Sequence, residues 1–178
     1  LGSIKINKEE RTKMYKTIPR SSVIGFLIGV LPGAGATIAS FLAYGMERNV
    51  VNDEEKEKFG KGSVNGLSAP ETANNAACSG SFVPMLTLGI PGSGTTAVML
   101  GALLGFGVQP GPRLYMTNPE IFWSIIMSMY IGMVILLILN LPLIPYIARI
   151  LAVPKNYLIP LILFFSITGI YVMSFNNF

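Results

Sequence analysis

The chain has 178 residues, of which 51% are hydrophobic and only 12% are charged, and its mean hydropathy is +0.57. One globular interior needs far fewer apolar residues, so the composition predicts an integral membrane protein. The net charge is +4, and the sequence contains no histidine and a single cysteine, Cys78. Histidine-dependent catalysis, imidazole metal sites and an internal disulfide are therefore excluded within this stretch. We expect Cys78 to be a small, buried core residue.

Basic residues gather in the N-terminal segment, residues 1–20, where only Glu9 and Glu10 oppose them. Basic residues flank membrane spans on the cytoplasmic side, so this pattern predicts a cytoplasmic juxtamembrane segment and not a nucleic-acid surface. The sequence begins at Leu1 without a methionine and ends at Phe178 directly after an apolar run, so we expect a piece of a longer chain. The basic residues of the segment are Lys5, Lys8, Arg11, Lys13, Lys16 and Arg20.

Four intervals without a charged residue are each long enough to cross a bilayer, which takes about 20 apolar residues. The sequence therefore predicts an all-α membrane protein. Near the ends of the last two intervals, Trp123, Tyr130, Tyr146 and Tyr157 suit the membrane interface. We expect a juxtamembrane segment at 1–20, a broken or re-entrant membrane segment at 21–46, a polar loop with a short helix at 47–71, a broken membrane segment at 72–112, a loop at 113–120, a transmembrane helix at 121–148, a loop at 149–155 and a transmembrane helix at 156–178.

Proline and glycine interrupt the first two intervals near their centres. Residues 32–35 read Pro-Gly-Ala-Gly and residues 91–94 read Pro-Gly-Ser-Gly. In the first interval the ten residues on each side of the break would span about 15 Å as helix, half the hydrocarbon core. The breaks belong to an internal repeat, because residues 31–37 align with residues 90–96, with identity at the proline, both glycines and the last threonine. We expect two broken or re-entrant helical segments with these Pro-Gly tips at membrane depth.

The polar loop 47–71 carries ten charged residues, which we expect to be solvated, and a short helix over 52–59 that the Asn52 side chain caps. If segment 21–46 is a re-entrant hairpin, this loop lies on the side of the N-terminal segment. Twelve basic residues then share one side and only Arg113 lies on the other, whereas four single crossings would split them seven against six. The positive-inside rule favours the hairpin.

Non-helical backbone at membrane depth is tolerated only where protein or a watery cavity surrounds it, so the two breaks predict a cavity. The N-termini of half-helices offer partial positive charge and free N–H groups to an anion, and nearby hydroxyls add donors. The alternative is that the glycines allow close helix packing and the hydroxyls bind backbone carbonyls. The candidate substrate-binding residues are Pro32, Gly33, Gly35, Thr37, Pro91, Gly92, Ser93, Gly94, Thr95 and Thr96.

A second group of candidates follows Pro70, which predicts a helix start and places Glu71, Asn74 and Asn75 near the first turn. Amide carbonyls can coordinate a cation, and amide N–H groups can donate to a carboxylate. The Glu71 carboxylate can bind a cation or cap the helix. We expect these three residues to bind a coupling ion or to act in gating; the alternative is capping and tethering of the loop.

Five segments of the sequence, in order and spacing, resemble the large membrane subunit of tripartite tricarboxylate transporters. They read GFLIGVLPGAGAT at 25–37, FGKG at 59–62, APETANNA at 69–76, LTLGIPG at 86–92 and PGP at 110–112. The resemblance covers nearly the whole chain and implies a middle-to-C-terminal portion of a multi-pass protein of the prokaryotic cytoplasmic (inner) membrane.

This resemblance implies secondary transport by symport: uptake of citrate or other small carboxylates, driven by a Na⁺ or H⁺ gradient and without a cofactor. It also implies three partners besides the substrate, namely a small membrane subunit, an extracytoplasmic solute-binding protein and the lipid bilayer. The rival function is a non-transporting membrane assembly or anchor subunit, in which the glycines only pack helices. An enzyme is disfavoured, because the stretch lacks histidine and any charge-paired nucleophile.

Overall fold

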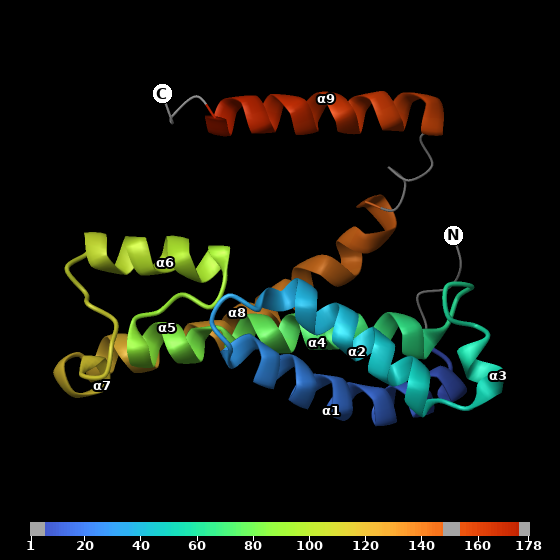
Figure 1. Cartoon of the computed structure of the whole chain (residues 1–178), viewed down its shortest axis with the longest axis horizontal. Coiled ribbons are helices and arrows are strands. Elements are labelled where there is room, and N and C mark those ends of the chain that lie inside the picture. The colour runs from blue at the N-terminus through green and yellow to red at the C-terminus, as the bar shows by residue number, and fades with distance from the viewer. Residues whose placement is uncertain (1–5, 148–153, 175–178) are drawn as a thin grey trace. The chain divides into compact units, whose positions relative to one another are not determined.

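The computed structural model describes residues 6–147 and 154–174, and the regular structure within them is helical (Figure 1). The chain forms two compact units that divide between Ile125 and Ile126. The helices are α1 Lys8–Val30, α2 Gly35–Val50, α3 Asp53–Lys56, α4 Val64–Gly80, α5 Phe82–Leu88, α6 Gly94–Gly105, α7 Leu114–Thr117, α8 Pro119–Ile147 and α9 Lys155–Ser174.

The basic N-terminal segment and the first arm of the predicted hairpin form one continuous helix, α1. Asn7 caps it by accepting hydrogen bonds from the backbone N–H groups of Glu9 and Glu10, and the Glu10 side chain completes the capping box. The helix then continues past Pro19 to Val30. A single capped helix therefore covers both the predicted juxtamembrane segment 1–20, from Lys8 on, and the first arm of the predicted membrane segment 21–46.

Helices α1, α2 and α4 pack against one another through small residues (Figure 1). A Cβ atom built on Gly25 would lie 2.3 Å from the carbonyl oxygen of Ala73, and one on Gly29 would lie 2.2 Å from that of Ala77, so α1 and α4 run parallel in close contact. Such close approach is what small residues at four-residue spacing permit. The buried row comprises Thr17, Ser21, Gly25 and Gly29 of α1, Ala39, Ala43 and Glu47 of α2, and Asn65, Ala69, Ala73 and Ala77 of α4.

One end of this three-helix bundle is closed by a buried ion pair. Glu47 is fully buried, and its carboxylate accepts hydrogen bonds from Arg20 at 2.8 and 3.0 Å and from Thr17 Oγ1 at 2.8 Å. Asn65 Nδ2 also donates to it at 3.2 Å. The expectation that Glu47 belongs to a solvated loop is wrong, because α2 extends through Val50 and places Glu47 one turn beyond Ala43, on the inner face.

The connection between α2 and α4 is shorter than the predicted loop 47–71. Asn52 caps the short helix α3, as expected, by accepting from the N–H of Glu55 at 3.1 Å. Lys13 of α1 contacts Glu55 at 2.7 Å, and this hydrogen bond lowers the pKa of the Glu55 carboxyl and raises that of Lys13. The connection is thereby tied to α1.

Helix α4 begins earlier than the proline signal predicts. Ser63 caps it by accepting from the N–H of Gly66 at 3.0 Å, and Pro70 lies inside the helix. The expected start after Pro70 is therefore wrong: a side-chain cap is available seven residues upstream. The Pro70 carbonyl accepts a hydrogen bond from Ser40 of α2 at 3.2 Å, which adds a polar contact between the helices.

Within the described residues, α8 is the one helix that is long and apolar enough to cross a membrane, at 29 residues. Helix α6 and residues 156–172 are apolar but shorter. None of the residues of α8 is buried within the chain. The last residue of the predicted span 121–148, the last four of 156–178 and most of the loop 149–155 lie outside the described residues.

The contact between α1 and α4 makes a prediction about Gly25. Gly25→Ala should lower the free energy of unfolding by about 1–3 kcal/mol, because the new methyl group forces the two backbones apart. Gly45→Ala in α2 is the matched control, since a Cβ there meets nothing within 4 Å, and it should be neutral or slightly stabilising. Thermal unfolding of the full-length protein in detergent measures both, and equal melting temperatures for the two variants would contradict the packing argument.

Candidate functional site

The first Pro-Gly tip joins α1 to α2. The Leu31 N–H donates to the Ile28 carbonyl at 3.0 Å and ends α1. Gly33 and Gly35 have φ of +80° and +69°, values that favour glycine, so these two positions turn the chain back into α2. At the N-cap of α2, Ala34 has no side chain that could accept from the first-turn N–H groups. Those groups therefore lack a side-chain cap.

The second tip joins α5 to α6 and has a different local structure. Gly89, with φ of +71°, ends α5, and Ser93 caps α6. Ser93 and Thr96 form a capping box, with Thr96 N–H to Ser93 Oγ at 3.2 Å and Ser93 N–H to Thr96 Oγ1 at 2.8 Å. The hydroxyls of Ser93 and Thr96 thus cap α6, which is a structural role that needs no ligand. Thr95, by contrast, is exposed.

The junction between α4 and α5 contacts the last turn of α1 and the second tip. A Cβ atom on Gly80, the last residue of α4, would lie 2.5 Å from the Phe26 carbonyl oxygen and 3.2 Å from Gly29 Cα, just before the first tip. The next residue, Ser81, is buried, and a Cβ on Gly92 of the second tip would lie 2.9 Å from its Cβ. This junction therefore contacts the end of α1 just before the first tip, and it contacts the second tip directly.

The structure separates the three residues predicted to bind a coupling ion. Asn74 faces α2 and donates to Ser40 Oγ at 3.3 Å, while the Asn75 side chain is exposed and donates to the Glu71 carbonyl of its own helix at 2.9 Å. Glu71 is exposed in the interior of α4 and is not in its first turn. A helix-capping role for Glu71 is therefore wrong, and only Asn74 lies toward the bundle.

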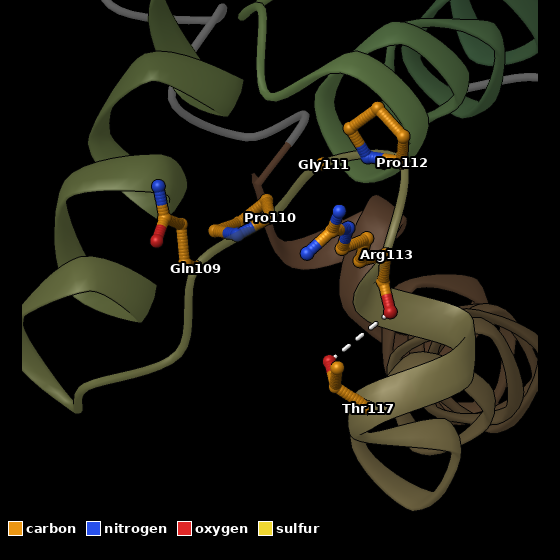
Figure 2. Close-up of a pocket in the computed structure, with 6 residues that line it drawn as sticks. All are labelled: Gln109, Pro110, Gly111, Pro112, Arg113 and Thr117. Carbon is orange, nitrogen blue, oxygen red and sulfur yellow. Dashed lines mark hydrogen bonds between the residues drawn. The ribbon is translucent and has the colours of Figure 1, made fainter.

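A pocket of about 390 Å³ lies at the turn that leads from α6 into α7, beyond the second tip (Figure 2). The turn is held against α5, because Gly111 N–H donates to the Leu86 carbonyl at 3.2 Å. A Cβ on Gly89 would lie 2.7 Å from the Pro110 carbonyl oxygen, so the turn also closely contacts the residue that ends α5, two positions before Pro91. The lining residues are Gln109, Pro110, Gly111, Pro112, Arg113 and Thr117.

Sequence reasoning missed the inner row of the bundle and its buried ion pair. A signal was present in α4, where Ala69, Ala73 and Ala77 recur at four-residue spacing. That spacing places these three residues on the inner face and turns the next residue, Cys78, outward. The expectation of a buried Cys78 is accordingly wrong, since the thiol is exposed.

An all-helical chain with interrupted helices and a long, exposed apolar helix has the architecture of a helical membrane protein. The model of the tripartite tricarboxylate transporter TctA family matches residues 2–178, so the chain belongs to that family. This confirms the resemblance that the five segments predict. Members of this family are components of transporters that are assembled with partner subunits.

Two relatives from Agrobacterium vitis are similar to nearly the whole chain. An uncharacterized 52.8 kDa protein in the TAR-I ttuC' 3' region is 41% identical over 173 residues, which cover 97% of this chain and 34% of that protein. An uncharacterized protein in the TAR-II ttuC' 3' region is 44% identical over 154 residues, covering 86% and 63% respectively. The chain thus spans about a third of the first relative and under two thirds of the second. No solved structure matches it.

The contact of the second tip with the α4–α5 junction makes a prediction about Gly92. Gly92→Ala should destabilise the protein by about 1–3 kcal/mol, because the new methyl group pushes the tip off Ser81. In the control, Gly94→Ala, the added Cβ meets nothing within 4 Å, and the melting temperature should stay at its wild-type value. Thermal unfolding of the full-length protein in detergent measures both variants, and an unchanged melting temperature in Gly92→Ala would show that the tip does not depend on this contact.

Proposed function

We propose that this chain is part of the membrane subunit of an ion-gradient-driven secondary transporter for tricarboxylates or other small carboxylates, supplied by an extracytoplasmic solute-binding protein. Membership of the TctA family supports transport. The observation that carries the site is that the α4–α5 junction contacts the end of α1 through Gly80, just before the first tip, and contacts Gly92 of the second tip through Ser81. Two helix breaks that follow such contacts with one junction are suited to enclose a small ligand.

The first tip is the better candidate for direct contact with a carboxylate. The N-terminus of α2 has partial positive charge and no side-chain cap, and Thr37 in its first turn is exposed. A carboxylate there would accept hydrogen bonds from backbone N–H groups and from the Thr37 hydroxyl. In the second tip, the capping box leaves Thr95 as the exposed hydroxyl, with Pro91 and Gly94 beside it.

For a metal coupling ion such as Na⁺, Asn74 is the candidate that the fold favours. Its side chain lies between α4 and α2 and contacts Ser40, which is one turn beyond Thr37 of the first tip. Its carbonyl oxygen and the Ser40 hydroxyl are both neutral oxygen ligands of the kind that a cation accepts. Asn75 lies on the exposed face of α4, and Glu71 lines a pocket with Glu10 and Met14 of α1 that Asn74 does not line.

We further propose that α1 and α2 form a re-entrant hairpin, with both outer ends on the cytoplasmic side. The hairpin arrangement places twelve of the 13 basic residues on that side. The contact of Lys13 with Glu55 supports this, since it joins the N-terminal part of α1 to the connection after α2.

This topology predicts which residues an impermeant thiol reagent reaches from outside intact cells. In a Cys78→Ser background of the full-length protein, Asp53→Cys should stay unlabelled and Asn118→Cys should be labelled, because the two exposed positions lie on opposite sides. Permeabilised cells should label both, which controls for reactivity. Labelling of Asp53→Cys from outside would overturn the hairpin.

The second candidate function is a non-transporting assembly or anchor subunit. The packing of Gly25, Gly29 and Gly80 and the capping by Ser93 and Thr96 favour it, because each of these residues has a structural role that needs no ligand. Counterflow of labelled citrate and other di- and tricarboxylates in proteoliposomes, with the full-length protein and its small membrane subunit, separates the two functions. Only a transporter exchanges substrate across the bilayer.

The same assay tests the first tip. Thr37→Val should raise the half-saturation concentration for the carboxylate several-fold, because the isosteric side chain removes one hydrogen-bond donor without changing its size. Thr12→Val, at the other end of the bundle, is the matched control, since its hydroxyl donates to the Lys8 carbonyl of its own helix. Equal half-saturation in both variants would remove Thr37 from the binding site.

A further inference from the structure

The pocket beside α7 contains an unpaired cation in a region that otherwise lacks charge. Arg113 is the only charged residue between Glu71 and Glu120. It is exposed and is the only charged residue that lines the pocket, and no acidic side chain of the described residues pairs with it. By contrast, Lys13 and Arg20 are both held in ion pairs with glutamates. The guanidinium of Arg113 is therefore free to bind an anion.

The wall of this pocket is rigid. Pro110 and Pro112 each fix their own φ, and Pro110 is buried against the end of α5. The Thr117 hydroxyl donates to the Arg113 carbonyl at 3.1 Å, which holds the backbone of Arg113 at the start of α7 (Figure 2). Gln109 lines the same pocket and is exposed, so its amide is a second donor. The buried Pro110 and the Thr117–Arg113 hydrogen bond thus fix the backbone from which the two exposed donor side chains extend.

We propose that this pocket binds one carboxylate group of the transported anion, at a site separate from the two tips. A guanidinium is a planar fork that matches a carboxylate through two parallel hydrogen bonds, and the Gln109 amide can add a third. The volume of about 390 Å³ falls within the range of small-molecule sites. The inference rests on the proposed function, because it takes the ligand class from carboxylate transport.

The position of the pocket gives this site a role in the path of the substrate. Its wall contacts Leu86 and Gly89, and Gly89 ends α5 two residues before Pro91 of the second tip. In the hairpin topology, Arg113 lies opposite the twelve other basic residues, on the side from which a solute-binding protein delivers its ligand. An anion held by Arg113 is thus on the outer side of the same segment that leads to the tips.

The test is equilibrium binding of labelled citrate, with further di- and tricarboxylates as a panel, to the purified full-length protein with its small membrane subunit. The solute-binding protein is omitted so that its affinity does not set the measured value. Arg113→Gln should weaken binding about tenfold, as expected for loss of a charge-assisted bidentate pair. Arg113→Lys should cause a smaller loss, because it keeps the charge but not the fork.

Lys61→Gln is the matched control, because it removes one exposed positive charge from the connection before α4 and should leave binding unchanged. Gln109→Glu should weaken binding as well, since the new carboxylate would pair with Arg113 and repel the ligand. If Arg113→Gln binds with wild-type affinity and has a normal melting temperature, the proposal that this pocket binds the carboxylate is wrong. The proposed function is then unaffected. Absence of both binding and counterflow in the wild type overturns the proposed function and this inference together.

Discussion

The contact between α1 and α4 at Gly25 and Gly29 is the constraint on which the rest of the first unit depends. The two backbones approach so closely that a methyl group on either glycine would overlap the facing carbonyl. This contact sets the register in which Gly80 reaches Gly29 and Ser81 reaches Gly92. In a bilayer, where burial of apolar surface against lipid contributes little, van der Waals packing of this kind is what holds helices together.

The bundle has two unlike ends. At one end, the Arg20–Glu47 pair and its hydrogen bonds join all three helices, and the contact of Lys13 with Glu55 ties the following connection to α1. At the other end the chain turns at glycines with positive φ, and the backbone donors of α2 have no side-chain cap. The ion pair holds the three helices together at one end of the bundle. At the other end, the uncapped backbone N–H groups of α2 are suited to contact a ligand.

The internal repeat shows how similar sequences take different structures. In the first copy Ala34 cannot cap the next helix, whereas its counterpart Ser93 forms a capping box with Thr96. The change from alanine to serine decides which tip retains unsatisfied N–H groups. Glycine also has two roles, because Gly33 has positive φ and open space around it, while its counterpart Gly92 packs on Ser81. The repeat therefore predicts two breaks but not equal binding roles.

The sequence by itself determined the helical class, the two breaks, the cap of α3 and the family, because these depend on local composition, spacing and motif order. Only the tertiary structure decided that Glu47 is buried and that Cys78 is exposed. It also separated Asn74 from Asn75 and placed Gly80 against the end of α1 and Ser81 against Gly92 of the second tip. The physical reason is that which face of a helix is buried depends on the neighbour it packs against, and α1 and α4 lie far apart in the sequence.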